Sequence, residues 1–226
     1  MRVVSLVPSV TETLLAWGIE PVACTRFCEQ PSLSHVGGTK NPDVAAIVEL
    51  APDVVVVNDE ENRREDADAL AAAGLDVHVV TVRSVDDVTP ALVQLAERVG
   101  ARFDPWPSLP TPPPAAARTA FVPIWRRPWM TLNADTYGSS VLAGVGVANV
   151  YADDAERYPT VTLEDAVDRH PDVVLAPTEP YPFRIDHVPE LEKVAPVVVV
   201  DGKDLFWWGV RTPDALQRLQ AVLSGR

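Results

Sequence analysis

Runs of valine, each preceded by a helix-like segment, constrain the fold of this chain more than any other feature. Val54–Val57 and Val197–Val200 are uninterrupted, residues 3–7 and 173–176 are mostly apolar, and the valine-rich segment 76–82 is expected to be another strand. A sheet with one wet face would show alternating apolar and polar residues, whereas strands buried on both faces read as continuous apolar runs. The pattern therefore predicts an α/β fold whose parallel sheets are covered by their own crossover helices.

Capping patterns divide the chain into strand and helix units. Ser9–Glu12 has the spacing of a capping box and predicts a helix that Gly18 ends. Asn41–Pro42 fits an N-cap followed by proline in the first helical turn, and Thr162–Asp165 caps a helix in the second half. A further helix is expected over residues 84–101.

The order of elements repeats along the chain. Pro52–Asp53 and Pro171–Asp172, which lie 119 residues apart, each stand between a helix-like segment and a valine-rich strand. This repeat predicts two similar lobes, at residues 1–83 and 119–226, with a cleft between them. Ligands of open parallel sheets bind beyond the carboxyl ends of the strands. Chance recurrence of Pro-Asp after a helix is the alternative reading.

The lobes are expected to be joined by a helix and a proline-rich linker at residues 84–118. Six of the 22 prolines lie between Asp104 and Pro114. Proline removes a backbone donor and clashes with the preceding helical turn, so no helix passes through this stretch. We expect a semi-rigid polyproline spacer.

Net charge and hydropathy exclude several classes of protein. Thirty-two acidic residues oppose 19 basic ones, for a formal net charge of -13, which disfavours binding to nucleic acid or anionic lipid. No apolar run has the length of a membrane span. Pro8 and Glu12 interrupt the stretch that a signal peptide would need. The expected location is therefore the cytoplasm, or outside it if a leader has been removed.

Aromatic and arginine side chains gather in loops that follow predicted strands. Residues 125–129 and 206–211 contain four of the six tryptophans and three arginines, and Tyr181 lies between two prolines in another such loop. Clustered rings and guanidinium groups suit a flat, partly apolar, anionic ligand. Packing of the rings at the lobe junction is the alternative. The expected ligand contacts are Trp125, Arg126, Trp129, Tyr181, Trp207, Trp208 and Arg211.

Catalytic and metal-binding patterns are weak. The chain has neither a Gly-x-Ser-x-Gly elbow nor a glycine-rich phosphate loop. Cys24, Cys28 and His35 could supply three metal ligands, but structural zinc takes four, with tighter Cys-x-x-Cys spacing. We expect no metal site and two reduced thiols.

Six motifs distinguish the chain: Arg2–Glu12, Phe27-Cys28-x-x-Pro31, Val36–Gly38, Asn41–Pro42, Pro52–Val55 and Trp207-Trp208-Gly209-x-Arg211-Thr212. Together they resemble the cobalamin-binding branch of the substrate-binding proteins that serve ATP-driven importers of corrinoids, siderophores and haem. The resemblance covers nearly the whole chain apart from the middle. It implies two Rossmann-like lobes bridged by a long helix, which the proline run here replaces in part.

The resemblance also implies roles for individual residues. Phe27, Trp129 and Tyr158 match positions where cobalamin binders present rings to the corrin, and Trp207 and Arg211 match the last loop of the cleft. Thr39 stands where some relatives have tryptophan.

Docking on a membrane permease is implied for one acidic residue of each lobe. Glu164 matches that position in the second lobe, but Ala45 stands at the first-lobe position, which weakens docking on an ABC permease.

The leading hypothesis is a non-enzymatic binding protein for cobalamin or another corrinoid, haem or a ferric siderophore, acting as an intracellular carrier or sensor. No covalently held cofactor is implied. The second hypothesis is a small cytoplasmic enzyme of corrinoid processing that uses the same cleft, with Glu12, Glu60 or Glu179 as acid or base. An interaction module that recruits a partner through its proline run is the third.

Overall fold

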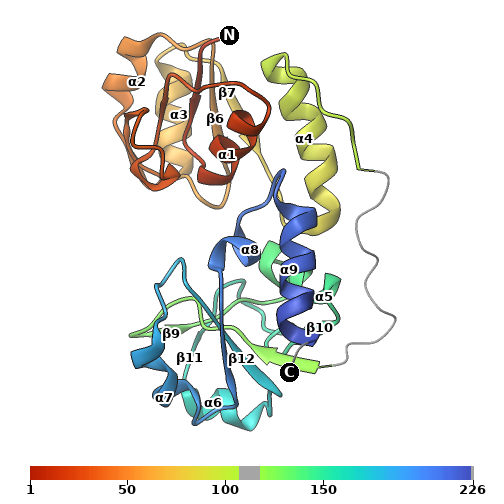
Figure 1. Cartoon of the computed structure of the whole chain (residues 1–226). Coiled ribbons are helices and arrows are strands. Elements are labelled where there is room, and N and C mark those ends of the chain that lie inside the picture. Colours follow the sequence, from red (N-terminus) through yellow and green to blue (C-terminus); the bar gives the residue numbers. More distant parts are fainter. Residues whose placement is uncertain (107–117, 225–226) are drawn as a thin grey trace. The chain divides into compact units, whose positions relative to one another are not determined.

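The computed structural model describes residues 1–106 and 118–224, and its contacts divide these residues into two compact units (Figure 1). The N-terminal unit comprises residues 1–82, 86–106 and 208–210, and the C-terminal unit comprises residues 83–85, 118–207 and 211–224. The predicted domain boundaries after residues 83 and 118 stay predictions. From Pro107 onward, the predicted proline-rich spacer lies outside the described residues.

A five-stranded parallel sheet forms the centre of the N-terminal unit, as the valine runs predict. Its order is β3-β2-β1-β6-β7, and every neighbouring pair is parallel. All five residues of β6 are buried, because helices cover both faces of the sheet. The strands are β1 (Val3–Ser5), β2 (Ala23–Cys24), β3 (Ser34–His35), β6 (Val54–Asn58) and β7 (Val77–Val80).

Helices cover the two faces of this sheet in turn. Ile47 of α2 and Leu70 of α3 pack in one core with Val55 and Val57 of β6. The other face is covered by α1, whose Thr11 Oγ1 lies 2.8 Å from Ser5 Oγ. The helical segments are α1 (Pro8–Ala16), the 3-10 turn η1 (Arg26–Cys28), α2 (Val44–Leu50), α3 (Arg64–Ala72) and α4 (Val85–Val99), and β4 (Gly37–Gly38) pairs antiparallel with β5 (Asn41–Pro42).

Two predicted helix starts in this unit are wrong. Ser9 is not an N-cap: α1 begins at Pro8, whose ring already holds the helical φ, and the N-cap is Val7, two residues before Ser9. Asn41–Pro42 is drawn into the hairpin of β4 and β5, so Asp43 caps α2 instead. The Asp43 carboxylate accepts from the Ala46 N–H at 3.0 Å.

A four-stranded parallel sheet forms the centre of the C-terminal unit. Its order is β10-β8-β12-β13, and the strands are β8 (Arg118–Phe121), β10 (Val147–Asn149), β12 (Val173–Pro177) and β13 (Val197–Val200). Phe121, Val174 and Ala176 pack on one face against Ala166 and Leu191. The prediction of a second parallel sheet is confirmed.

Helices of the C-terminal unit begin and end near the predicted signals. The predicted cap at Thr162 is confirmed as a full capping box, in which Thr162 and Asp165 satisfy each other's backbone N–H groups. The helical segments are α5 (Tyr137–Gly144), α6 (Leu163–Asp168), η2 (Ile185–His187), α7 (Val188–Leu191), α8 (Gly202–Phe206) and α9 (Thr212–Ser224), and β9 (Trp129–Met130) pairs antiparallel with β11 (Thr160–Val161).

The repeated Pro-Asp unit has the same local structure in both units. The Asp53 carboxylate accepts from the Arg2 N–H at 2.6 Å, and the Asp53 N–H donates to the Arg2 carbonyl at 2.8 Å. The Asp172 carboxylate accepts from the Thr119 N–H at 2.7 Å, and the Asp172 N–H donates to the Thr119 carbonyl at 3.0 Å. In each unit the aspartate therefore ties the start of one central strand to the start of its neighbour.

Candidate functional site

A short hairpin positions the first group of predicted ligand contacts in the C-terminal unit. The Met130 N–H donates to the Trp125 carbonyl at 3.2 Å and the Ile124 N–H donates to the Met130 carbonyl at 2.9 Å, which closes the loop 125–130. Trp129 is held from the other side, because β9 pairs with β11. Backbone pairing therefore holds the loop 125–129 in place at both of its ends.

Rings from two loops meet beside this hairpin. We call Trp125, Trp129, Tyr181, Phe183 and His187 the C-terminal aromatic cluster. Tyr181 lies at its centre: its ring centroid is 5.6 Å from that of Trp125, in an edge contact at 75°, and 4.8 Å from that of Phe183. Trp129 stacks on Phe183 with the ring planes 6° apart, and His187 lies 5.6 Å from Tyr181. Edge and offset contacts of this kind fix the orientation of each ring.

Exposure separates the members of the cluster that can meet a ligand from those that cannot. The Trp125 side chain is 45% exposed, and Trp129 and Tyr181 are partly buried. Phe183, which follows Tyr181 in the connection between β12 and η2, is 2% exposed and belongs to the hydrophobic core. Trp125 therefore presents its ring to solvent while Phe183 supports the cluster from below.

One of the two arginines of this loop, Arg126, is already paired. Nε and Nη2 of Arg126 donate to Oε2 of Glu190 at 2.9 and 2.7 Å, and the guanidinium lies 5.9 Å from the centroid of Trp129. Sequence reasoning missed Glu190, since nothing in the chain pattern links α7 to the loop. The net positive charge available to a ligand at this point is lower than predicted.

A second group surrounds Trp207. Lys203 Nζ lies 4.8 Å and the Arg211 guanidinium 5.5 Å from the Trp207 ring centroid. The buried carboxylate of Asp204 accepts from Arg211 Nη1 at 3.0 Å and from Arg218 Nη2 at 2.7 Å. Two guanidinium groups thus share one carboxylate, which holds Arg211 in place.

The remaining predicted contacts lie elsewhere. Phe27, in η1 of the N-terminal unit, is 50% exposed, with the Arg26 guanidinium 4.8 Å from its ring centroid. Trp208, grouped with the N-terminal unit, is 3% exposed, and this burial disfavours a ligand contact. Tyr158 is 39% exposed and stands in the connection between β10 and β11.

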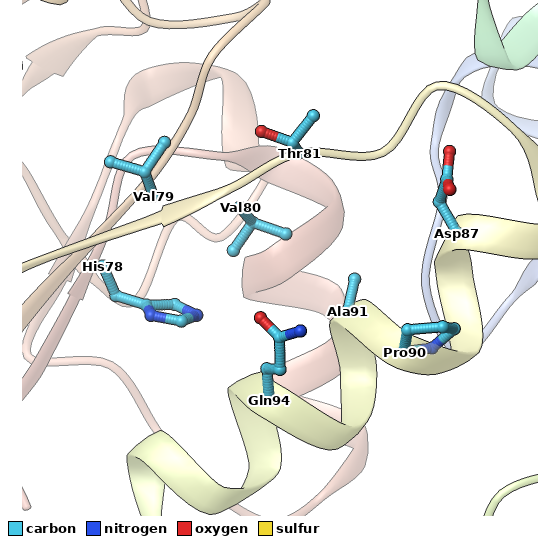
Figure 2. A pocket seen from close by; sticks show the side chains of 8 residues that line it. All are labelled: His78, Val79, Val80, Thr81, Asp87, Pro90, Ala91 and Gln94. Atoms are coloured by element: carbon cyan, nitrogen blue, oxygen red, sulfur yellow. The ribbon is translucent and has the colours of Figure 1, made fainter.

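A cavity of about 350 Å³ lies in the N-terminal unit between β7 and α4. Figure 2 shows His78 and Gln94 pointing toward each other from these two elements. Burial lowers the pKa of His78, which favours a neutral imidazole. None of the predicted ligand contacts lines this cavity, whose walls are His78, Val79, Val80, Thr81, Asp87, Pro90, Ala91 and Gln94.

The acid or base candidates of the enzyme hypothesis find no support in burial. Glu12, Glu60 and Glu179 are all partly exposed, and the buried carboxylate of Asp204 is paired with arginines. Across residues 1–106 and 118–224, no three His, Cys, Asp or Glu side chains are grouped as a metal site would require. Within the same ranges, no helix is both long enough and apolar enough to cross a bilayer.

Comparison with known proteins gives consistent results. The model of the family described as "Periplasmic binding protein" matches residues 3–103. The vitamin B12-binding protein of Salmonella choleraesuis (strain SC-B67) is 25% identical over 197 residues, which cover 77% of this chain and 71% of that protein. The vitamin B12-binding protein of Yersinia pestis (strain Pestoides F) is 26% identical over 196 residues, or 77% and 68%.

Solved structures share the fold of the whole chain. The periplasmic vitamin B12 binding protein BtuF of Vibrio cholerae has a TM-score of 0.76 at 17% identity, with 99% of this chain and 96% of that chain covered. The periplasmic heme binding protein HutB of Vibrio cholerae has a TM-score of 0.76 at 20% identity, with 99% and 98% covered. Residues 3–103 therefore match a family of periplasmic binding proteins, and the solved structures share the fold of this chain.

The two positions predicted to dock on a permease are structurally equivalent. Glu164 is the second residue of α6 and Ala45 is the second residue of α2, and both are exposed. Only the C-terminal unit therefore carries an acidic side chain at this place.

Proposed function

We propose that this chain binds a flat metal-chelating macrocycle, a corrinoid first and haem next, on the C-terminal aromatic cluster. The observation that carries the proposal is the contact of Trp125 with Tyr181, which holds a ring that is 45% exposed in one orientation. A ring that is ordered before binding costs less entropy when a ligand stacks on it.

Charge around the cluster favours the corrinoid. Arg126 is neutralised by Glu190, and Asp204 compensates part of the charge at Arg211. Corrinoids carry mostly neutral amide side chains, whereas haem carries propionate carboxylates that need unpaired cations. The names of the relatives, which include vitamin B12-binding and heme-binding proteins, support the same ligand class.

Phe27, Tyr158, Trp207 and Arg211 are proposed as further contacts. Phe27 and Tyr158 are exposed rings, and the Trp207 group offers a stacked ring with a fixed cation. Trp208 is left out because it is buried. The cleft between the lobes, expected from the sequence, stays a prediction.

Titration with cyanocobalamin, haemin and ferric siderophores, by calorimetry and absorbance, tests the proposal. Trp125→Ala and Tyr181→Ala should each weaken binding about tenfold, or about 1.4 kcal/mol. Trp106→Ala, which removes a ring that contacts Phe103 in the other unit, is the matched control and should bind as the parent does. No binding tighter than about 1 mM for any of these ligands would overturn the proposal.

Docking on a permease is proposed to be weaker than in a protein with two acidic anchors. Glu164 is exposed in the first turn of α6, while Ala45 offers no charge at the matching place of α2. A carrier that works without a permease is the alternative role. Ala45→Glu should strengthen binding to a permease of this importer class in nanodiscs, and unchanged binding would contradict the docking role of this position.

A further inference from the structure

Two free thiols are buried together in the N-terminal unit. Cys24 is the last residue of β2, and Cys28 is the last residue of η1, the turn that follows. The two residues are 0% and 2% exposed, and they pack with Leu33 in a small cluster of their own. Neither the proposed ligand contacts nor the main core of the sheet uses them.

Hydroxyl groups surround the sulfur of Cys28. Its Sγ lies 3.2 Å from Thr11 Oγ1 and 3.2 Å from Thr25 Oγ1. Thr11 is held by α1 and also contacts Ser5, so its hydroxyl is fixed. A cysteine in a purely apolar core would have no such neighbours, and hydroxyl donors stabilise a thiolate.

The two thiols therefore differ in acidity. The pKa of Cys28 is lowered because the Cys24 thiol and then the Thr11 and Thr25 hydroxyls donate to its sulfur, against the opposing effect of burial. The pKa of Cys24 is raised because its proton is held by Cys28 and because the side chain is buried. Cys28 is the better nucleophile, and Cys24 is placed to react with it next.

We propose that Cys24 and Cys28 form an oxidation site at which hydrogen peroxide generates an intramolecular disulfide. The Cys28 thiolate attacks one peroxide oxygen, the O–O bond breaks, hydroxide leaves, and Cys28 becomes a sulfenic acid. Cys24 then loses its proton and attacks the Cys28 sulfur; the S–O bond breaks and water leaves as the S–S bond forms. Two thiols are oxidised, and one peroxide is reduced to two molecules of water.

Access to Cys28 comes through the turn that carries it. The turn η1 is a single 3-10 turn whose backbone is held by the bond from the Cys28 N–H to the Thr25 carbonyl at 3.1 Å. Short exposed turns open locally at little free-energy cost. Arg26, Phe27 and Glu29, which flank Cys28 in the chain, are all exposed.

Oxidation of Cys24 and Cys28 is expected to change ligand binding, and this consequence rests on the proposed function. Phe27, a proposed ligand contact, lies between the two cysteines in the chain and is 50% exposed. A disulfide from Cys24 to Cys28 closes a covalent loop that contains Phe27. Oxidation therefore changes the position of the Phe27 side chain, and with it the affinity of the chain for the macrocycle.

The first experiment counts thiols and needs no ligand. The full chain is treated with hydrogen peroxide, denatured and alkylated with N-ethylmaleimide, and its intact mass is then measured by mass spectrometry. We expect the loss of both alkylation sites and of two hydrogen atoms, reversed by dithiothreitol. Two alkylation sites that remain after treatment would overturn the proposal, and so would a disulfide between two chains.

Variants assign the order of the two steps. Cys24→Ser should stop at the sulfenic acid, trapped by dimedone, while Cys28→Ser should react at least about tenfold more slowly. Thr11→Val should also slow the reaction, because it removes one hydroxyl donor. Equal rates for Cys24→Ser and Cys28→Ser would contradict the assigned roles, and circular dichroism checks that each variant is folded.

The second experiment links the site to binding. Cyanocobalamin is titrated into the reduced and the oxidised chain, and the dissociation constants should differ about tenfold. Equal constants would overturn the link to Phe27. Absence of binding in both forms would overturn the proposed function, whereas the thiol count would still decide whether the disulfide forms.

Discussion

Glu190 and Arg126 are 64 residues apart in the chain, and a single carboxylate oxygen of Glu190 accepts both hydrogen bonds from the guanidinium. The ion pair is partly exposed, with side-chain exposures of 34% for Glu190 and 20% for Arg126. The pair lowers the charge that Arg126 adds to the C-terminal aromatic cluster.

Removing the carboxylate should change which macrocycle binds better. Glu190→Gln leaves Arg126 charged, so we expect haemin, which carries carboxylates, to bind about three- to tenfold tighter at low salt. Cyanocobalamin has no net charge and should bind as before. Glu192→Gln, two residues away and exposed, is the control. Equal gains for both ligands in calorimetric titrations would contradict this account.

The Asp172 carboxylate should stabilise the fold except in acid. Its pKa is lowered because the Thr119 N–H and then the Thr119 hydroxyl donate to it. A lowered folded-state pKa stabilises above the ordinary value of 3.8, and this stabilisation is lost as pH falls through the lowered pKa.

Asp172→Asn tests this dependence. The variant should have a lower urea midpoint than the parent at pH 7, and the two midpoints should converge in acid. Asp168→Asn, at the exposed end of α6, should match the parent throughout. A constant difference between Asp172→Asn and the parent at every pH would count against the hydrogen-bond explanation.

Tyr151 should destabilise the fold in alkali. Burial raises its pKa to about 12, from an ordinary value of 10.0, since the phenolate is disfavoured in the core. The stabilisation is present below the ordinary pKa and is lost as pH rises toward the folded value.

Tyr151→Phe separates the ring from its hydroxyl. The Tyr151 oxygen has no hydrogen-bond partner among the described residues, so the variant should lie within about 1 kcal/mol of the parent at pH 7. It should also lack the alkaline loss in urea unfolding. Tyr158→Phe, which changes an exposed ring, should behave as the parent. A large loss of stability at pH 7 would show that the hydroxyl is paired.

Gly209 should not tolerate a side chain. Its φ is +126°, and a Cβ atom at this position would meet Thr13 Oγ1 of α1. We expect Gly209→Ala to cost more than about 2 kcal/mol of unfolding free energy. Gly18→Ala, at φ +75° with no atom near the added Cβ, isolates the backbone effect and should cost about 1 kcal/mol. Equal losses in thermal unfolding would exclude the contact with Thr13.

Sequence reasoning found the strands because their signal is local and redundant. Four adjacent valines at 54–57 favour a strand that is buried on both faces, and β6 is such a strand, whereas the same run at Val197–Val200 forms β13, in which Val199 is 42% exposed. Helix starts were less certain, since Ser9 and Asn41 fit cap patterns that Pro8 and the β4–β5 hairpin override. Pro8 starts the helix at its own position, and the pairing with Gly37 and Gly38 takes Asn41 and Pro42 out of α2, so a cap pattern alone does not decide where a helix begins.

Of the candidate site, only the aromatic side chains could be predicted from the sequence. Trp125, Trp129 and Tyr181 stand out as clustered aromatics in loops, and the structure brings them together. Glu190 and Asp204, which set the charge beside them, belong to helices distant in sequence and give no local signal. Partners of this kind are fixed by tertiary packing, which one sequence does not encode locally.

The N-terminal unit includes a short segment, residues 208–210, that is synthesised long after the rest of the unit. Residues 1–82 and 86–106 supply its sheet and helices, but Gly209 and Val210 join it from near the other end of the chain, where the Val210 N–H donates to Thr13 Oγ1 at 3.4 Å. A ribosome adds about 5–20 residues per second. The residues of this unit that are translated first therefore wait several seconds for residues 208–210, and the unit is complete only after these have been added.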